Sequence, residues 1–198
     1  MGNGINRRAF LGAGAVTTAA CAAAPAVRRQ GSARAVVIAS ANGFQSRNDD
    51  GLTCVELAFR HMTSGDDVLD ALIAGVNVVE LDPEDTSVGY GGLPDADGVV
   101  TLDACCMHGP KRRAGGVAFL QGVRTPSLVA QAVADVTDHH LLVGQGAQDF
   151  ARRLGFTIED DLNTERSRAL WLEWKRRTDP DHYPDPADHA AAGYAVGR

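Results

Sequence analysis

The chain has few residues of the kinds that define disulfide-rich or nucleic-acid-binding proteins. Its 198 residues include only 4 cysteines, and the spacing of Cys21, Cys54, Cys105 and Cys106 does not form a disulfide framework. The formal net charge is -6, and the 19 lysines and arginines are scattered along the chain. A nucleic-acid partner is therefore not expected. With 44% hydrophobic residues, the chain can still bury the core of one globular domain.

A metal or cofactor site is not expected either. Cys105, Cys106 and His108 lie close together, but three potential ligands without a second pair at zinc-finger spacing do not define a zinc site. If their segment is a strand, the two cysteines point to opposite faces. We therefore expect one cysteine in the core and His108 in a surface turn. Residues 144–149 imitate a dinucleotide-binding fingerprint, but Asp149 replaces its third glycine, so a strand-to-helix turn is expected.

The N-terminal residues have the composition of an export signal. Arg7 and Arg8 stand directly before an apolar, alanine-rich run that extends to Ala26. Paired arginines ahead of such a run are typical of a twin-arginine signal. Residues 1–33 are therefore predicted to be a leader, and the protein is expected in the periplasm or outside the cell. Two alternatives stay open: Cys21 as a lipidated first residue, and a disordered alanine-rich tail.

Hydrophobic periodicity predicts one α+β domain over residues 34–177. Strands are predicted at 35–39, 99–105, 115–120 and 140–143, and helices at 52–62, 69–79, 126–136, 147–154 and 165–177. The first strand is rich in β-branched residues and is expected to be buried on both faces. The second and third strands are joined by a short, turn-prone spacer, which predicts an antiparallel hairpin. Residues 178–198 are turn-rich and acidic, and are predicted to be a linker or tail.

A glycine-rich loop, SVGYGGLP at residues 87–94, precedes the hairpin. Gly89, Gly91 and Gly92 remove side-chain obstruction, so the loop has the composition of one whose backbone amides turn toward an anion or an oxyanion. Carboxylates of the preceding helical region are expected only to cap the helix or to face water: Asp66, Asp70 and Glu80.

Several segments in this order resemble the N-terminal α chain of the glycosylasparaginases, which belong to the asparaginase type 2 family of N-terminal nucleophile hydrolases. The resemblance extends from about residue 36 to residue 177. The segments that define it are Leu69-Asp70-Ala71, Asp82-Pro83, Ser87-Val88-Gly89-Tyr90-Gly91-Gly92-Leu93-Pro94-Asp95, Leu102-Asp103-Ala104 and Leu142-Val143-Gly144-Gln145-Gly146-Ala147.

The resemblance implies an αββα sandwich, in which two sheets face each other between outer layers of helices. It also implies a precursor that cuts itself before a threonine, whose hydroxyl then attacks the substrate while its new α-amine accepts the proton. The implied substrate is asparagine N-glycosylated on its side chain, and no cofactor is involved. The implied partner is the β chain of the same precursor, in an αβ heterodimer and a dimer of these.

The sequence departs from the family at the cleavage site, because no His-Asp-Thr or His-Gly-Thr is present. We therefore expect an incomplete sandwich, the α-chain half, that has no catalytic residue of its own, is inactive alone, and aggregates or is degraded. Its contribution would be a wall of the substrate pocket: Ser87, which aligns with a family pocket serine, with Asn42 and Asp103.

A second departure lies in the first predicted strand, where many members of the family have Ser-Thr-Trp and this chain has Ala39-Ser40-Ala41. The loss of a large rigid indole puts specificity for the glycosylated substrate in question. Two alternatives therefore stay open: a relative that acts on asparagine or isoaspartyl peptides, and a truncated remnant without catalytic activity.

Overall fold

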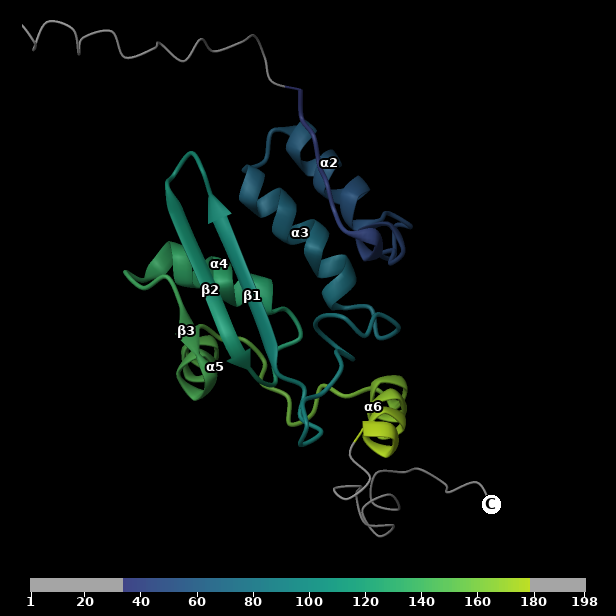
Figure 1. Ribbon diagram of the computed structural model, residues 1–198. Helices are drawn as coiled ribbons and strands as arrows, with labels where there is room; N and C mark the ends of the chain where they lie inside the picture. The colour runs from purple at the N-terminus through teal and green to yellow at the C-terminus, as the bar shows by residue number, and fades with distance from the viewer. Residues whose placement is uncertain (1–33, 179–198) are drawn as a thin grey trace, which may run out of the picture. The chain divides into compact units, whose positions relative to one another are not determined.

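The computed structural model describes residues 34–178, and these form helices and one small sheet (Figure 1). The elements are η2 (Ala41–Phe44), α2 (Cys54–Ser64), α3 (Val68–Glu80), β1 (Leu102–His108), β2 (Arg113–Leu120), α4 (Pro126–Val136), β3 (Leu142–Val143), α5 (Gly144–Arg153) and α6 (Glu165–Thr178). The α+β class agrees with the prediction. Within this range no helix is both long and apolar enough to cross a bilayer. The predicted leader, with Arg7, Arg8 and Cys21, and residues 179–198 lie outside the described range.

The sheet has the strand order β1-β2-β3. Strands β1 and β2 form the predicted antiparallel hairpin, with Leu102 opposite Leu120 and His108 opposite Arg113. Strand β3 pairs with β2 in parallel through only two residues. The sheet is therefore mixed, and the prediction of a strand at 140–143 is correct only for its second half.

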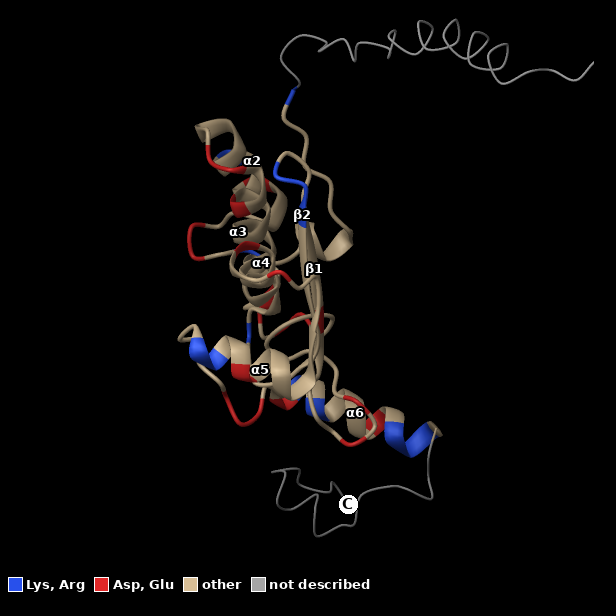
Figure 2. Cartoon of the chain, turned by 90° about the vertical axis from the view of Figure 1, so that its left-hand side faces the viewer, with Lys and Arg blue, Asp and Glu red and all other residues tan. Residues whose placement is uncertain are grey.

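Helices α4 and α5 cover one face of the sheet (Figure 2). Small and branched apolar side chains of the sheet and both helices form the main core cluster: Val117, Leu120, Val123, Val129, Ala130, Val133, Ala147 and Ala151. Strand β2 approaches α4 so closely at Gly115 that a Cβ there would lie 2.2 Å from the carbonyl oxygen of Ala130. This close approach leaves no room for a side chain.

The opposite face of the sheet is left uncovered by the described residues (Figure 2). Along β1, Asp103, Cys105 and Met107 are exposed, and Met107 is 75% exposed. Cys106 points the other way and packs against the main core, so the prediction of one cysteine in the core and one outside it is confirmed. The αββα sandwich that the resemblance implies has two sheets, and residues 34–178 form one sheet of three strands.

Helices α2 and α3 pack against each other, and local signals fix where each begins. Thr53 and Glu56 form a capping box at the start of α2. The side chain of Asp67 accepts a hydrogen bond from the backbone N of Leu69 and caps α3. The N-cap is therefore Asp67 rather than Asp66, which instead contacts His61 at the surface.

One strand prediction was wrong and another was correct only in its second part, and both differences have a physical cause. Residues 35–39 form no strand, and Val36 and Ile38 are 66% and 88% exposed. A strand is defined by hydrogen bonds to a neighbour, and no described segment pairs with this one. The strand predicted at 99–105 begins at Leu102 because Val99 is bonded to the turn at Asp95: its carbonyl oxygen accepts from the backbone N of Asp95, and its N donates to Oδ1 of Asp95.

Candidate functional site

The side chains of Asn42 and Ser87 meet, although 45 positions separate them in the sequence. Asn42 lies in η2, and Ser87 lies in the loop after α3. The Nδ2 atom of Asn42 donates a hydrogen bond of 3.0 Å to Oγ of Ser87. The structure therefore brings together two of the three predicted pocket residues.

A continuous row of polar side chains extends from this pair in both directions. Ser40 Oγ donates to Oδ1 of Asn42, and Ser87 Oγ donates to Oδ1 of Asp85. The same Oδ1 of Asp85 accepts from the backbone N of Ser87 at 2.8 Å, which closes a tight turn two residues long. Asp85 was expected only as part of the loop that leads to Ser87 and was not among the predicted pocket residues.

A cavity of about 290 Å³ lies beside this row, between residues 37–43 and the helices α2 and α3. Its walls are mostly apolar, with Leu72, Val76 and Val79 of α3 on one side. Ser40 and Asn42 also line it, so polar groups stand at the edge of an apolar hollow. This combination is typical of sites for small organic ligands.

The glycine loop does not present its amides to a ligand, so the predicted anion or oxyanion site is wrong for Tyr90, Gly91 and Gly92. The backbone N of Tyr90 donates to the carbonyl oxygen of Glu80, that of Gly91 to Leu162, and that of Gly92 to Gly89. These three N–H groups are therefore already bonded to backbone carbonyl oxygens and are not available to an anion. The loop is instead folded tightly onto its surroundings.

Gly89 shows why glycine is required in this loop. Its φ is +60°, and a Cβ would lie 2.1 Å from the carbonyl oxygen of Glu80. Gly91 also has a positive φ, of +87°. Only glycine adopts such conformations without strain, so the glycines fix the path of the loop that positions Ser87.

Glu80 is buried beneath this loop, contrary to the prediction that it faces water. It is 2% exposed, and its carboxyl group accepts from the backbone N of Ser127 at 3.0 Å, from Ser127 Oγ at 2.7 Å and from Asn77 Nδ2 at 2.6 Å. Burial raises the pKa of Glu80 above its ordinary value, although these hydrogen bonds oppose the shift. Glu80 therefore joins the end of α3, the start of α4 and the glycine loop.

Asp103 is not brought to the Asn42–Ser87 pair by any hydrogen bond. Its Oδ1 accepts from the backbone N of Phe119 at 2.8 Å, across the irregularity in the β1–β2 register between Leu102 and Ala104. The side chain thus accepts from a donor that the irregular register leaves without a ladder partner. Its observed hydrogen bond lies within the hairpin, and its place in a pocket wall stays a prediction.

His108 is buried, so its predicted place in a surface turn is wrong. It is 4% exposed, and its Nε2 lies 2.9 Å from both carboxylate oxygens of Asp67. Strand β1 extends three residues beyond the predicted end, and alternation places His108 on the covered face with Cys106. Hydrogen bonding from His108 is the main cause that holds the pKa of Asp67 well below its usual range. Among the described residues, no three His, Cys, Asp or Glu side chains are grouped so that they could hold a metal ion.

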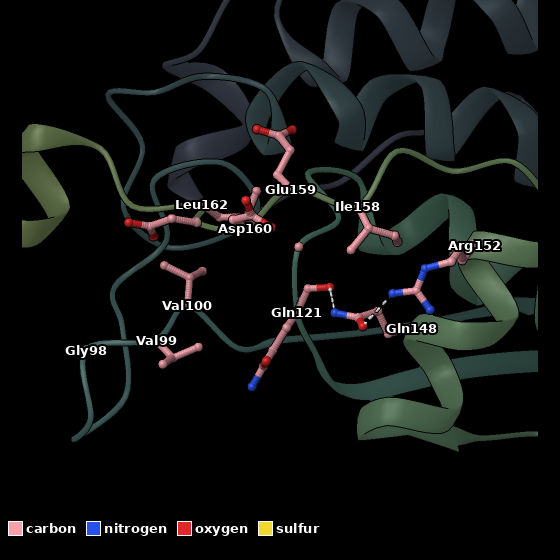
Figure 3. A pocket seen from close by; sticks show the side chains of 12 residues that line it. Gly98, Val99, Val100, Gln121, Gln148, Arg152, Ile158, Glu159, Asp160 and Leu162 are labelled. Atoms are coloured by element: carbon pink, nitrogen blue, oxygen red, sulfur yellow. Dashed lines mark hydrogen bonds between the residues drawn. The ribbon is translucent and has the colours of Figure 1, made fainter.

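A second pocket, of about 430 Å³, lies between the segment before β1, the second half of α5 and residues 158–162 (Figure 3). Figure 3 shows Gln148 between Gln121 and Arg152. Gln148 donates to the backbone oxygen of Gln121 at 3.2 Å and accepts from Arg152 at 3.0 Å. Across the pocket, Glu159 is paired with Arg124 at 2.6 Å. These groups satisfy one another, so they do not mark a ligand site.

The geometry therefore defines one edge of a pocket suited to a small ligand, and the surrounding fold is of the α+β class. A family model described as asparaginase matches residues 14–193. The chain belongs to this asparaginase family.

Relatives with similar sequences come from distant organisms. An N(4)-(beta-N-acetylglucosaminyl)-L-asparaginase of Elizabethkingia miricola is 46% identical over 117 residues, 59% of this chain and 34% of the relative. The mouse protein of the same name is 40% identical over 139 residues, 68% and 40% of the two chains. A plant-type L-asparaginase of Pyrococcus abyssi is 43% identical over 109 residues, 55% and 35%. The match thus spans between about a third and two fifths of these relatives.

Proposed function

We propose that the chain is the N-terminal part of an amidohydrolase that cleaves the amide bond of N4-(β-N-acetylglucosaminyl)-L-asparagine and releases aspartate. The observation that supports this most directly is the Asn42–Ser87 hydrogen bond, because it joins two separate segments at the mouth of an apolar cavity. Ser87 also opens the glycine loop through which the sequence resembles the glycosylasparaginases.

The nucleophile in this proposal is the N-terminal threonine of a second polypeptide, the β chain, freed by self-cleavage of a precursor. Its hydroxyl attacks the amide carbonyl, and its α-amine accepts the hydroxyl proton. An α-amine has an ordinary pKa of about 7.7 to 8.0, so a useful fraction is neutral near pH 7. Asn42 and Ser87 supply polar groups on one wall of the site.

The uncovered face of the sheet is the second observation in favour of this proposal, because it needs another polypeptide to cover it. Met107 and Cys105 are exposed on the sheet face that α4 and α5 do not cover, and Val36 and Ile38 are exposed in an unpaired segment. Exposed apolar faces and unpaired strand-like segments are normally covered in a stable protein. In the proposed assembly the β chain covers both, completes the αββα sandwich and forms an αβ heterodimer that pairs with a second copy. Export through Arg7 and Arg8 belongs to the same proposal.

A second candidate activity is the hydrolysis of plain asparagine or isoaspartyl peptides. The similarity to the plant-type L-asparaginase supports it. So does Ala41, which stands where glycosylasparaginases have tryptophan, because a methyl group offers a sugar no stacking surface. The two candidates differ in the leaving group rather than in the attacking chemistry.

The test is to co-express residues 34–198 with the part of the Elizabethkingia relative that lies beyond the matched region, made so that its first residue is the nucleophilic threonine. Aspartate release is then measured with glycosylated asparagine, asparagine and an isoaspartyl dipeptide. The proposal predicts release from glycosylated asparagine, strict dependence on both polypeptides, and loss when the threonine is changed to alanine.

Each other outcome identifies a different error. Release from asparagine or the dipeptide alone would support the second candidate. A stable, co-purifying complex with no activity on any of the three substrates would contradict both candidates and favour a non-catalytic remnant.

A further inference from the structure

The hydrogen bonds around Ser87 fix the direction of its hydroxyl proton. A serine hydroxyl has one proton to donate and two lone pairs that accept. Its partner Asp85 accepts at the same oxygen from the backbone N and from Oγ of Ser87. An ionised carboxylate has no proton to give, so Ser87 is the donor in the contact between the two side chains.

The orientation of Asn42 follows from this assignment. Because the proton of Ser87 is committed to Asp85, Ser87 accepts from Asn42, whose amide nitrogen therefore faces Ser87 at 3.0 Å. The amide oxygen then faces Ser40, whose hydroxyl donates to it. One lone pair of Ser87 Oγ is left, and the residue is exposed, so this lone pair is open to a ligand.

We propose that Asp85 is a positioning residue that makes Ser87 solely a hydrogen-bond acceptor, so that the group facing Ser87 in the completed site is an amine, amide or hydroxyl donor. This inference rests on the proposed function, since the donor belongs to the reacting groups. The negative charge of Asp85 increases the electron density on Ser87 Oγ and strengthens the bond to a donor. A carboxylate or phosphate oxygen at the same place would meet a lone pair instead of a proton.

The chain contains a matched control for Asp85. Asp82, three residues earlier, accepts from the backbone N of Glu84 at 2.9 Å through Oδ1 and so forms the same type of turn. Its side chain makes no contact with Ser87 or Asn42 among the hydrogen bonds of the described residues. Asparagine forms such turns as readily as aspartate. Substitution by asparagine therefore preserves both turns and removes only the charge.

The first measurement is kcat/KM of the co-expressed enzyme for its best substrate, with melting temperature recorded in parallel. Asp85→Asn is expected to lower kcat/KM roughly fivefold, the difference between a charged and a neutral hydrogen-bond partner, at an unchanged melting temperature. Asp82→Asn is expected to match the wild type in both. Equal kcat/KM in the wild type and Asp85→Asn would reduce Asp85 to a turn former and overturn the inference while the proposed function stands.

The second measurement needs no activity and tests the row of hydrogen bonds behind the inference even if the proposed function fails. The side-chain amide signals of Asn42 are recorded by ¹⁵N–¹H NMR in the wild-type chain and both variants. Asp85→Asn is expected to shift them through Ser87, and Asp82→Asn is expected to leave them in place. If Asp85→Asn leaves these signals unmoved, or both variants shift them alike, the proposed row of hydrogen bonds does not exist in solution.

Discussion

The two faces of the hairpin differ in how completely this chain covers them. On the covered face, Val117 and Leu120 of β2 are fully buried against α4, with Val129 and Val133. On the uncovered face, alternate positions of β1 are exposed: Asp103, Cys105 and Met107. The same strands therefore have one face packed as a protein interior and one face in contact with water.

This difference indicates which part of the fold the chain can stabilise alone. Hydrophobic burial on the α4–α5 side is complete within residues 34–178, so the apolar side chains of that side are buried without a second polypeptide. The other side has apolar residues without partners, which favours association with another polypeptide. The candidate site lies in the segment 40–42 and the loop at 85–87, next to the unpaired residues 35–39.

The largest expected effect comes from placing a methyl group on the covered face. Gly115→Ala puts a Cβ at 2.2 Å from the carbonyl oxygen of Ala130 and 2.5 Å from the backbone N of Ala134. Because both atoms belong to the backbone of α4, the helix must move. We expect the free energy of unfolding, measured with urea, to fall by about 3 kcal/mol.

The adjacent glycine provides the control on the other face. Gly116 pairs with Cys105, so a Cβ there would point to the uncovered side, where its nearest neighbour is a methyl group of Leu141 at 3.3 Å. Gly116→Ala is expected to change stability by less than about 0.5 kcal/mol. Similar losses for the two variants would break the distinction between the faces.

A smaller, pH-dependent effect is expected where the helical pair joins the hairpin. Asp67 caps α3 and contacts His108 at the end of β1 and Lys111 in the following turn. Its pKa is lowered, so its contribution to stability is present above the ordinary value of 3.8 and is lost as the pH falls below it. Asp67→Asn keeps the helix cap and removes the charge.

We therefore expect Asp67→Asn to melt below the wild type at pH 7, with the gap closing as the pH falls from about 4 toward 2. Asp66→Asn is the control, because among the described residues the side chain of Asp66 is paired with the surface residue His61 and not with β1. A gap that stays constant with pH would show that the carboxylate charge of Asp67 is not what joins the two regions.

Local sequence signals predicted much of the covered side. Pro126 at the start of α4, the spacing of apolar residues in α3 and α4, and the turn-prone spacer of the hairpin all correspond to observed elements. The failure at residues 35–39 has a different origin. Periodicity reports which residues can be buried, but strand formation also needs a partner, and none of the described segments supplies one.

The candidate site was predicted only in part, because its contacts are long-range. Ser87 and Asn42 were chosen through family resemblance, whereas the hydrogen bond between them depends on how η2 packs near the glycine loop. Glu80 was missed because a carboxylate at a helix end is usually solvated, and only tertiary packing places Ser127 above it. His108 was missed because its burial depends on where β1 ends, the least certain feature of a predicted strand.

The most direct test of the account is the reactivity of Cys105, which lies on the uncovered face, with a maleimide followed by peptide mapping. Cys105 is exposed, whereas Cys54 is buried and Cys106 is half-buried, so each reports on a different environment in one sample. We predict fast labelling of Cys105 in the chain alone and strong protection when the second polypeptide is bound. Slow labelling of Cys105 in the isolated chain, or equal labelling with and without the second polypeptide, would contradict the claim that this face is completed by another chain.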